Sequence, residues 1–193
     1  MLASLNKVIA SKRFILASAS PRRREIMQTL VSDDLLYTGT YRALYVIQYH
    51  LLWTRIYLCQ SEYDFLISAD TVVTLQGEIF GKPHNRTEAI ATLERLSGKT
   101  HEVLTGVCLF SFCDFGDRKC VTFHEVTAVT MAELDEDTIT AYVDSGEPMD
   151  KAGAYGIQGL GCSLIKRIEG DYFNVVGLPC YQLCYHIRSL CLR

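Results

Sequence analysis

The feature that most constrains the fold is an arginine-rich segment directly after a short apolar run. The run Phe14–Ala17 is predicted to be a β-strand, and Ser20 and Pro21 suit the N-cap and first position of a helix. A strand therefore ends and a helix begins here, with unpaired backbone N–H groups at the helix start. Arginines at 22–24 carry the wrong charge for the positive end of a helix dipole. N–H groups, serine hydroxyls and guanidinium groups together suit a phosphate chain, whereas the alternative is a solvated basic helix start.

The composition predicts a single globular domain over residues 1–193. Hydrophobic residues make up 49% of the chain and charged residues 21%, which is ordinary for a packed protein. The net charge of −3 argues against binding to a nucleic-acid polymer, so a nucleotide-like ligand should be a small molecule. Charged residues interrupt the apolar region 35–58, so no membrane span is expected. Eight cysteines without a C-x-x-C pair, and no evident secretion signal, favour buried free thiols in a reducing, cytoplasmic location.

Strand-like and helix-like segments alternate along the chain without a strict βαβ rhythm, which predicts an α/β fold with a mixed sheet. Expected strands are 65–75, 102–112, 119–131 and 163–168. Expected helices are 85–96, 135–144 and a last one from about 179. A glycine-rich loop covers 146–161, and a further polar turn covers 170–174.

Several polar residues stand where chemistry is more plausible than packing. Asp70 lies near the end of an apolar strand, where an unpaired carboxylate is costly, so it is a candidate base or metal ligand; capping a turn or pairing with an arginine is the alternative. Lys82, on a Gly-Lys-Pro turn, can reach a phosphate, although loop lysines are commonly just solvated. In the glycine-rich loop, Gln158 could read a base edge. Glu147 and Asp150 could hold a divalent ion.

Six motifs in one order resemble the Maf-type nucleoside triphosphate pyrophosphatases. The motifs are Ser-x-Ser-Pro-Arg-Arg-x-Glu from 18, Ser-Ala-Asp-Thr-Val-Val from 68, Gly-Lys-Pro from 81, Leu-Ser-Gly-x-x-His-x-Val-x-Thr-Gly-Val from 96, Gly-Glu-Pro-x-Asp-Lys-Ala-Gly-Ala-Tyr-Gly-Ile-Gln-Gly from 146 and Gly-Asp-Tyr-x-Asn-Val-Val-Gly-Leu-Pro from 170. The resemblance implies a mixed twisted α/β sheet flanked by helices, with a deep nucleotide cleft, similar to inosine triphosphate pyrophosphatases. It also implies cleavage of a nucleoside triphosphate into monophosphate and pyrophosphate with a divalent metal, Mg²⁺ or Mn²⁺. A homodimer is left open.

The same resemblance implies roles for individual residues. Ser18, Arg22 and Arg23 match the phosphate-binding loop, Asp70 the catalytic base and Lys82 a second phosphate contact. Asp70 is also the candidate metal ligand. The positions linked to base choice are Arg22, Thr71 and Gln158. A threonine after the aspartate, with the Ile-Gln-Gly loop, looks like the branch that acts on dTTP and UTP rather than the branch that prefers 7-methyl-GTP. Such an enzyme would remove surplus or modified nucleotides.

Residues 31–62 depart from the family pattern. Family members carry an acidic residue soon after the first helix and then a helix with a lysine-alanine pair, but this chain has no lysine between Lys12 and Lys82. The residues that could substitute are Asp33, Asp34 and Glu62 for the acid, and Arg42 or Arg55 for the lysine. Aromatic residues instead recur at every fourth position: Tyr37, Tyr41, Tyr45, Tyr49, Trp53 and Tyr57.

That aromatic spacing predicts a helix. The favoured interpretation is a helix packed on the sheet, and the alternatives are a stacking surface for bases or a segment altered by splicing or a gene-model error. The changed segment also raises a second functional hypothesis, a nucleotide-binding protein of the same fold that has lost catalysis. A third hypothesis is that the segment prevents stable folding.

Overall fold

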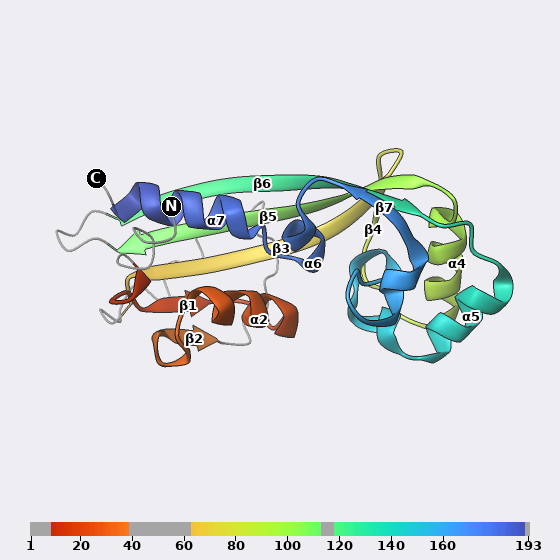
Figure 1. Cartoon of the computed structure of the whole chain (residues 1–193), viewed down its shortest axis with the longest axis horizontal. Helices are drawn as coiled ribbons and strands as arrows, with labels where there is room; N and C mark the ends of the chain where they lie inside the picture. Colours follow the sequence, from red (N-terminus) through yellow and green to blue (C-terminus); the bar gives the residue numbers. More distant parts are fainter. Residues whose placement is uncertain (1–8, 39–62, 113–117, 192–193) are drawn as a thin grey trace. The chain divides into compact units, whose positions relative to one another are not determined.

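The computed structural model describes residues 9–38, 63–112 and 118–191, and in these residues seven strands form one mixed sheet (Figure 1). The strands are β1 (Phe14–Leu16), β2 (Leu36–Thr38), β3 (Phe65–Leu75), β4 (Glu78–Phe80), β5 (Thr100–Phe112), β6 (Arg118–Met131) and β7 (Ile165–Glu169). Their order is β2-β1-β3-β5-β6-β7, and β4 pairs with β3 outside this path. β1 is parallel to β2 and β3, whereas β4 and β7 are antiparallel to β3 and β6. The predicted mixed α/β fold is confirmed.

The helices flank this sheet. They are α2 (Pro21–Leu30), α4 (Arg86–Leu96), α5 (Glu136–Asp144), α6 (Tyr172–Val176) and α7 (Cys180–Cys191), with 3₁₀ turns η1 (Asp33–Leu35), η2 (Glu147–Asp150), η3 (Ala152–Ala154) and η4 (Gly159–Leu164). The helix starts are those that the cap residues predicted. Ser20 Oγ accepts from Arg23 N at 3.4 Å, and Asn85 Oδ1 accepts from Glu88 N at 2.9 Å.

Three local expectations were wrong. The strand expected from 163 begins at Ile165, because η4 continues to Leu164. Part of the polar turn expected after Gly170 is helix α6. Tyr37 lies in strand β2 and not in a helix, since β2 pairs with β1 in register. The later members of the aromatic series, Tyr41, Tyr45, Tyr49, Trp53 and Tyr57, lie outside the described residues.

The cysteines of the described part of the chain are free thiols, as expected, but they are not uniformly buried. Cys108 and Cys184 are buried, whereas Cys120 and Cys162 are exposed. Among the helices described here, none is long and apolar enough to cross a membrane.

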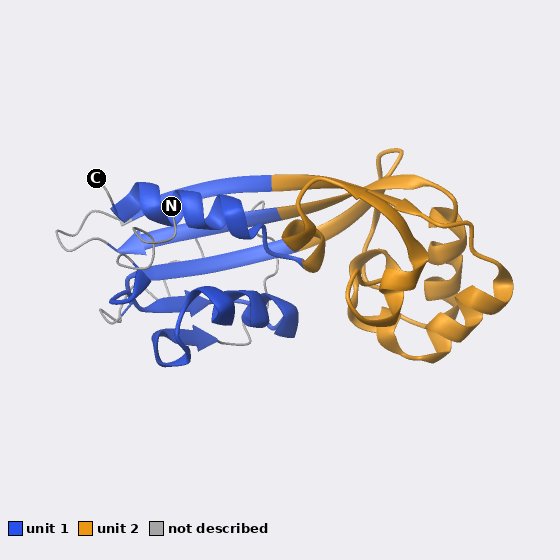
Figure 2. Ribbon diagram, viewed as in Figure 1, with its two compact units in different colours: residues 1–70, 106–124, 177–193 blue, residues 71–105, 125–176 orange. Residues whose placement is uncertain are grey.

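The chain divides into two compact units, each with its own core (Figure 2). Unit 1 comprises residues 1–70, 106–124 and 177–193. In its core, Phe14 of β1 and Phe65 of β3 are in register and their rings stack with centroids 5.1 Å apart. On α7, His186 stacks on Phe123 of β6 at 4.5 Å, so this helix packs against the sheet within unit 1.

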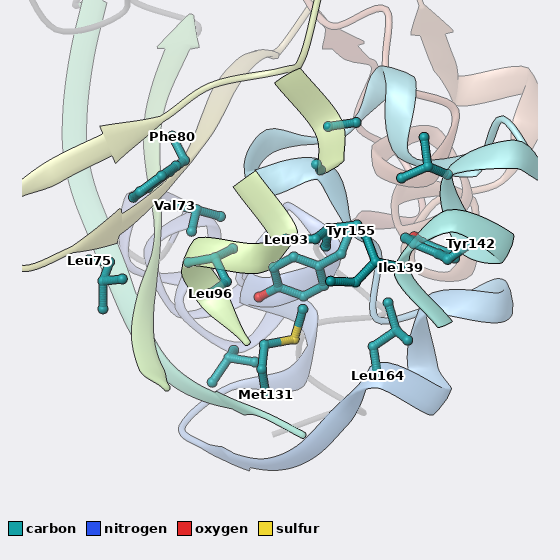
Figure 3. Packing of buried hydrophobic residues seen from close by; sticks show 14 of the residues in the cluster. Val73, Leu75, Phe80, Leu93, Leu96, Met131, Ile139, Tyr142, Tyr155 and Leu164 are labelled. Atoms are coloured by element: carbon teal, nitrogen blue, oxygen red, sulfur yellow. The ribbon is translucent and has the colours of Figure 1, made fainter. Parts of the chain in front are cut away.

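Unit 2 comprises residues 71–105 and 125–176. The apolar faces of α4 and α5 form much of its core, which also includes residues of the sheet and of the glycine-rich loop (Figure 3). Leu93 and Leu96 are fully buried, and Ile139 and Tyr142 almost so, and in each pair the three-residue spacing places the side chains on one helix face. Because Tyr142 belongs to this core, its position is set by packing.

Candidate active site

In unit 1, the predicted phosphate loop places a guanidinium group among polar partners. Arg23 Nη1 donates to Ser18 Oγ at 3.1 Å, and Arg23 Nε donates to the carbonyl oxygen of Gly177 at 2.7 Å. Ser18 Oγ also accepts from the backbone N–H of Ser20 at 3.2 Å. The strand-to-helix turn and the chain before α7 therefore fix Arg23 from two sides. We call Ser18, Ser20, Arg23, Asp70 and Gly177 the Arg23 cluster.

Asp70 belongs to this cluster through its charge. Burial lowers the pKa of Arg23 to about 10, the nearby Asp70 carboxylate opposes that shift, and the adjacent Arg22 adds to it. Arg23 is therefore still protonated at neutral pH, whereas Asp70 itself is exposed to solvent. The cluster combines a fixed cation, which suits phosphate oxygens, with an accessible carboxylate, which suits proton transfer or a metal ion. The structure thus brings Ser18, Arg23 and Asp70 close together, and their roles in binding and catalysis stay predictions.

In unit 2, a backbone hydrogen bond joins the Lys82 turn to the glycine-rich loop. The N–H of Gly153 donates to the carbonyl oxygen of Gly81 at 3.0 Å. Gly153 has φ +69°, and a Cβ there would lie 2.8 Å from a methyl carbon of Val73, so both conformation and space require glycine. Lys82, one residue from this bond, has an exposed side chain. The Lys82 turn and the loop that carries Gln158 are therefore parts of one local structure.

Thr71, the other candidate for base choice, begins a buried hydrogen-bond chain. Thr105 Oγ1 donates to the carbonyl oxygen of Asn174 at 3.0 Å, so in its 2.9 Å contact with Thr71 Oγ1 it is Thr71 that donates. Asn174 is fully buried, and its Nδ2 donates to Val103 O and Thr127 Oγ1 at 3.0 and 2.9 Å. The Thr71 hydroxyl is therefore oriented by the sheet and by α6.

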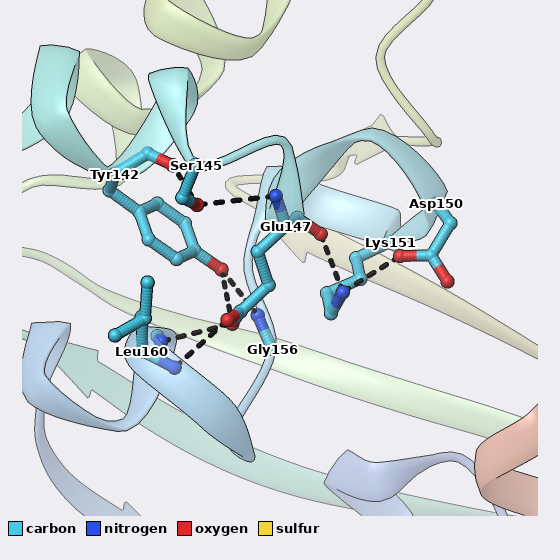
Figure 4. Close-up of polar contacts among 8 residues, drawn as sticks. Tyr142, Ser145, Glu147, Asp150, Lys151, Gly156 and Leu160 are labelled. Carbon is cyan, nitrogen blue, oxygen red and sulfur yellow. Dashed lines mark hydrogen bonds and ion pairs between the residues drawn. The ribbon is translucent and has the colours of Figure 1, made fainter.

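The suggestion that Glu147 and Asp150 hold a divalent ion is replaced by a different role (Figure 4). The Glu147 carboxylate accepts from Leu160 N, Gly161 N and the Tyr142 hydroxyl at 2.9, 3.0 and 3.0 Å. Asp150 Oδ1 pairs with Lys151 Nζ at 2.7 Å. Within the described ranges, no group of three or more His, Cys, Asp or Glu residues could hold a metal ion. Both acids therefore serve the internal structure of the loop.

Two contributors to the site were missed from the sequence. The Gly177 carbonyl is a backbone group, and because every residue has one, the residue type does not predict its role. Asn174 was noted only as part of a polar turn, although an asparagine among apolar valines is a signal of a buried amide, which must be hydrogen-bonded. Both follow from the path of the chain through α6 and into α7.

Of residues 31–62, which depart from the family pattern, the structure describes only 31–38. Asp33 Oδ1, in η1, accepts from Gln28 Nε2 of α2 at 2.6 Å. Glu62, Arg42 and Arg55, which were considered as substitutes for the family's missing acid and lysine, lie outside the described residues.

The mixed sheet flanked by helices places the chain in the α/β class, and its arginine–carboxylate cluster, where a strand turns into a helix, has the chemistry that suits a phosphate group. The chain belongs to the Maf family, since the family model described as "Maf-like protein" matches residues 13–190. It is 42% identical over 187 residues to a dTTP/UTP pyrophosphatase of Bacillus thuringiensis subsp. konkukian, covering 92% of this chain and 95% of that protein. The dTTP/UTP pyrophosphatase of Bacillus cereus strain G9842 is 43% identical over 187 residues, again covering 92% of this chain and 95% of that protein. The resemblance seen in the sequence is confirmed.

Proposed function

We propose that this chain is a nucleoside triphosphate pyrophosphatase that hydrolyses dTTP and UTP to the monophosphate and pyrophosphate, removing surplus or modified nucleotides. Its family and the names of its relatives support the reaction class. The observation that carries the proposal is the Arg23 guanidinium group, held by Ser18 and Gly177 beside the carboxylate of Asp70.

In the proposed reaction, water attacks the α-phosphorus and the bond from this phosphorus to the oxygen that bridges it to the β-phosphorus breaks. Asp70 takes the proton from the attacking water, and pyrophosphate leaves with the bridging oxygen. Arg22, Arg23 and Lys82 bind phosphate oxygens and neutralise the charge that builds on them in the transition state. Arg23 can act without reorganising, because its two partners already hold it.

A divalent cation, Mg²⁺ or Mn²⁺, fits this site as an ion carried by the substrate. Mg²⁺ is commonly held by one or two carboxylates together with substrate phosphates, and Asp70 is an exposed carboxylate beside the phosphate loop. We propose that Asp70 and the phosphates would hold the cation. When bound, the cation supplies Lewis-acid stabilisation of charge on the phosphate oxygens.

For base choice, we propose that Gln158 pairs with the adjacent N3–H and carbonyl of uracil or thymine through its amide oxygen and nitrogen. A flipped amide would also pair with cytosine, so other groups must fix the amide's orientation. We assign that orienting role to Thr71 and backbone groups, with Arg22 also contributing to selection. We therefore expect kcat/KM to be higher for UTP and dTTP than for CTP, ATP and GTP. A higher kcat/KM for purine nucleotides would overturn this assignment.

Incubation of purified protein with Mg²⁺ or Mn²⁺ and a panel of nucleoside triphosphates tests the reaction. We expect release of pyrophosphate, fastest from UTP and dTTP. No release from any nucleotide by folded protein would defeat the enzyme proposal. A nucleotide-dependent rise in melting temperature without turnover would instead favour the hypothesis that the segment 31–62 has cost the protein its catalysis. A broad, non-cooperative thermal transition would indicate that the segment prevents stable folding.

The remaining expectations also stay proposals: residues 1–193 as a single domain, a cytoplasmic location, and a homodimer. A further proposal is that the ligand is a small nucleotide held locally and not a nucleic-acid polymer, which the net charge of −3 supports. Fractionation of cells and light scattering of purified protein measure location and oligomeric state.

A further inference from the structure

The loop that carries Gln158 is tied down on both sides of that residue. On the C-terminal side, the N–H groups of Leu160 and Gly161 donate to the Glu147 carboxylate at 2.9 and 3.0 Å. On the N-terminal side, the N–H of Gly156 donates to the Tyr142 hydroxyl at 3.2 Å (Figure 4). Gln158 itself lies between these anchors with its side chain exposed.

The two anchors are one unit, because the Tyr142 hydroxyl donates to Glu147 Oε1 at 3.0 Å while it accepts from Gly156. Tyr142 is only 5% exposed and belongs to the core of unit 2, so its hydroxyl is a fixed point. Glu147 thus connects that fixed point to the backbone beyond Gln158. We call Tyr142 and Glu147 the loop anchor.

The glycines of the loop leave the space that this anchor needs. At Gly159, where φ is +67°, a Cβ would lie 2.6 Å from Glu147 Oε2. At Gly161, a Cβ would lie 2.2 Å from the carbonyl oxygen of Gly156, so the chain segments before and after Gln158 approach each other closely. The backbone at Gly159 therefore lies close to the Glu147 carboxylate, and the backbone at Gly161 lies close to that at Gly156.

The carboxylate is ionised in this setting. Partial burial by itself raises the pKa of Glu147, but hydrogen bonds from Leu160, Gly161 and Tyr142, and the charge of Lys151, outweigh it, so the pKa is lowered. All three donors face carboxylate oxygens, and an ionised carboxylate has acceptors only. A glutamine at this position would keep the shape but turn one acceptor into a donor that faces another N–H.

We propose that Glu147 is a positioning residue for base selection: through Leu160 and Gly161, and together with Tyr142, it holds Gln158 at the place and angle at which its amide distinguishes uracil and thymine from cytosine. The inference rests on the proposed function, because it assigns a cause to the selectivity of the same site. Glu147 touches no reacting atom in this role. It acts only through the loop backbone.

The test compares Glu147→Gln with the wild type in kcat/KM for UTP and CTP. The expected result is a loss of about tenfold in kcat/KM for UTP, as for one lost charge-assisted hydrogen bond, with a much smaller loss for CTP, so that the UTP/CTP ratio falls. If Glu147 had a merely structural role, its replacement would lower kcat/KM equally for UTP and CTP. The matched control is Asp144→Asn, the same acid-to-amide change on an exposed carboxylate that pairs with Arg86; it should leave the ratio unchanged.

Tyr142→Phe is the second variant, and it decides the matter if Glu147→Gln does not fold. It keeps the ring in the core and removes the hydroxyl that joins Glu147 to Gly156, so the UTP/CTP ratio should fall by about threefold, as for one neutral hydrogen bond. A ratio within twofold of wild type in the folded variants overturns the inference while leaving the enzyme proposal intact.

Measurements on the wild type distinguish failure of this inference from failure of the proposed function. If the wild type binds nucleotides without hydrolysing them, the Kd ratio for UTP and CTP replaces the kcat/KM ratio, with the same expected changes. If it neither hydrolyses nor binds any nucleotide, the proposed function fails and takes this inference with it.

Discussion

At the scale of the residue, Asp70 is the group whose replacement should separate chemistry from binding. Asp70→Asn keeps the shape of the side chain and removes its charge and basicity, so we expect turnover to be abolished while nucleotide binding remains. Pyrophosphate release and the nucleotide-dependent shift in melting temperature measure the two properties, with Asp144→Asn as the exposed acid-to-amide control. Equal activity of Asp70→Asn and wild type would remove Asp70 from the mechanism.

Arg23 should behave in the opposite way, because its role is to bind. Arg23→Ala removes the guanidinium group that Ser18 and Gly177 hold, and we expect nucleotide binding to weaken by about 1.5–3 kcal/mol, roughly ten- to a hundredfold in Kd. Titration calorimetry measures the change. Arg24→Ala is the control, since Arg24 is the exposed neighbour on the same helix. We expect this variant to bind nucleotide as the wild type does. Equal losses in the two variants would contradict a specific role for Arg23.

At the scale of the element, His101 of β5 makes stability depend on pH. Burial lowers the pKa of His101 to about 4, and its Nε2 contacts the buried Tyr155 hydroxyl at 2.6 Å. Because the pKa in the folded state lies below the unfolded value of about 6.5, the unfolded state binds the proton first as pH falls. The contribution is therefore fully present above pH 6.5 and is lost between 6.5 and about 4.

We expect the free energy of unfolding to fall by up to about 3 kcal/mol across this range because of His101. Urea unfolding at a series of pH values measures it, and His101→Gln should show a correspondingly shallower dependence on pH. His186, whose pKa burial also lowers, is present in both proteins and cancels in the comparison. Parallel pH profiles for the two proteins would contradict the assignment.

At the scale of the whole molecule, removal of metal should stop turnover without unfolding the chain. No described cluster of acids, histidines or cysteines provides a structural metal site, so the proposed cation would bind with the substrate's phosphates. We expect EDTA to abolish pyrophosphate release, excess Mg²⁺ to restore it, and the melting temperature without nucleotide to stay the same. Unfolding by EDTA would instead point to a structural metal.

The sequence was most informative about features that depend on residues close together in the chain. Ser20 and Asn85 predicted helix starts because an N-cap side chain binds a backbone N–H three residues away, and the structure has both bonds. The apolar strand 65–75 was predicted with the bounds that β3 has, although Asp70 lies in the middle of the strand and not near its end as expected. The motifs around Arg23, Asp70 and Gln158 indicated the family that the comparisons confirm. Tyr37 shows the limit, since a four-residue aromatic period predicted a helix where pairing with β1 makes a strand.

The sequence alone thus determined several helix starts, the α/β class and the Maf family, and it provided the candidate site residues, because short-range bonds and residue chemistry specify them. Only the tertiary structure decided what holds those residues. The Gly177 carbonyl lies 2.7 Å from Arg23 Nε across a separation of 154 residues, and no spacing rule predicts such a contact. The same is true of Glu147, whose residue type suited a metal ligand. Its role as part of the loop anchor depends on which donors the folded chain brings to its two oxygens.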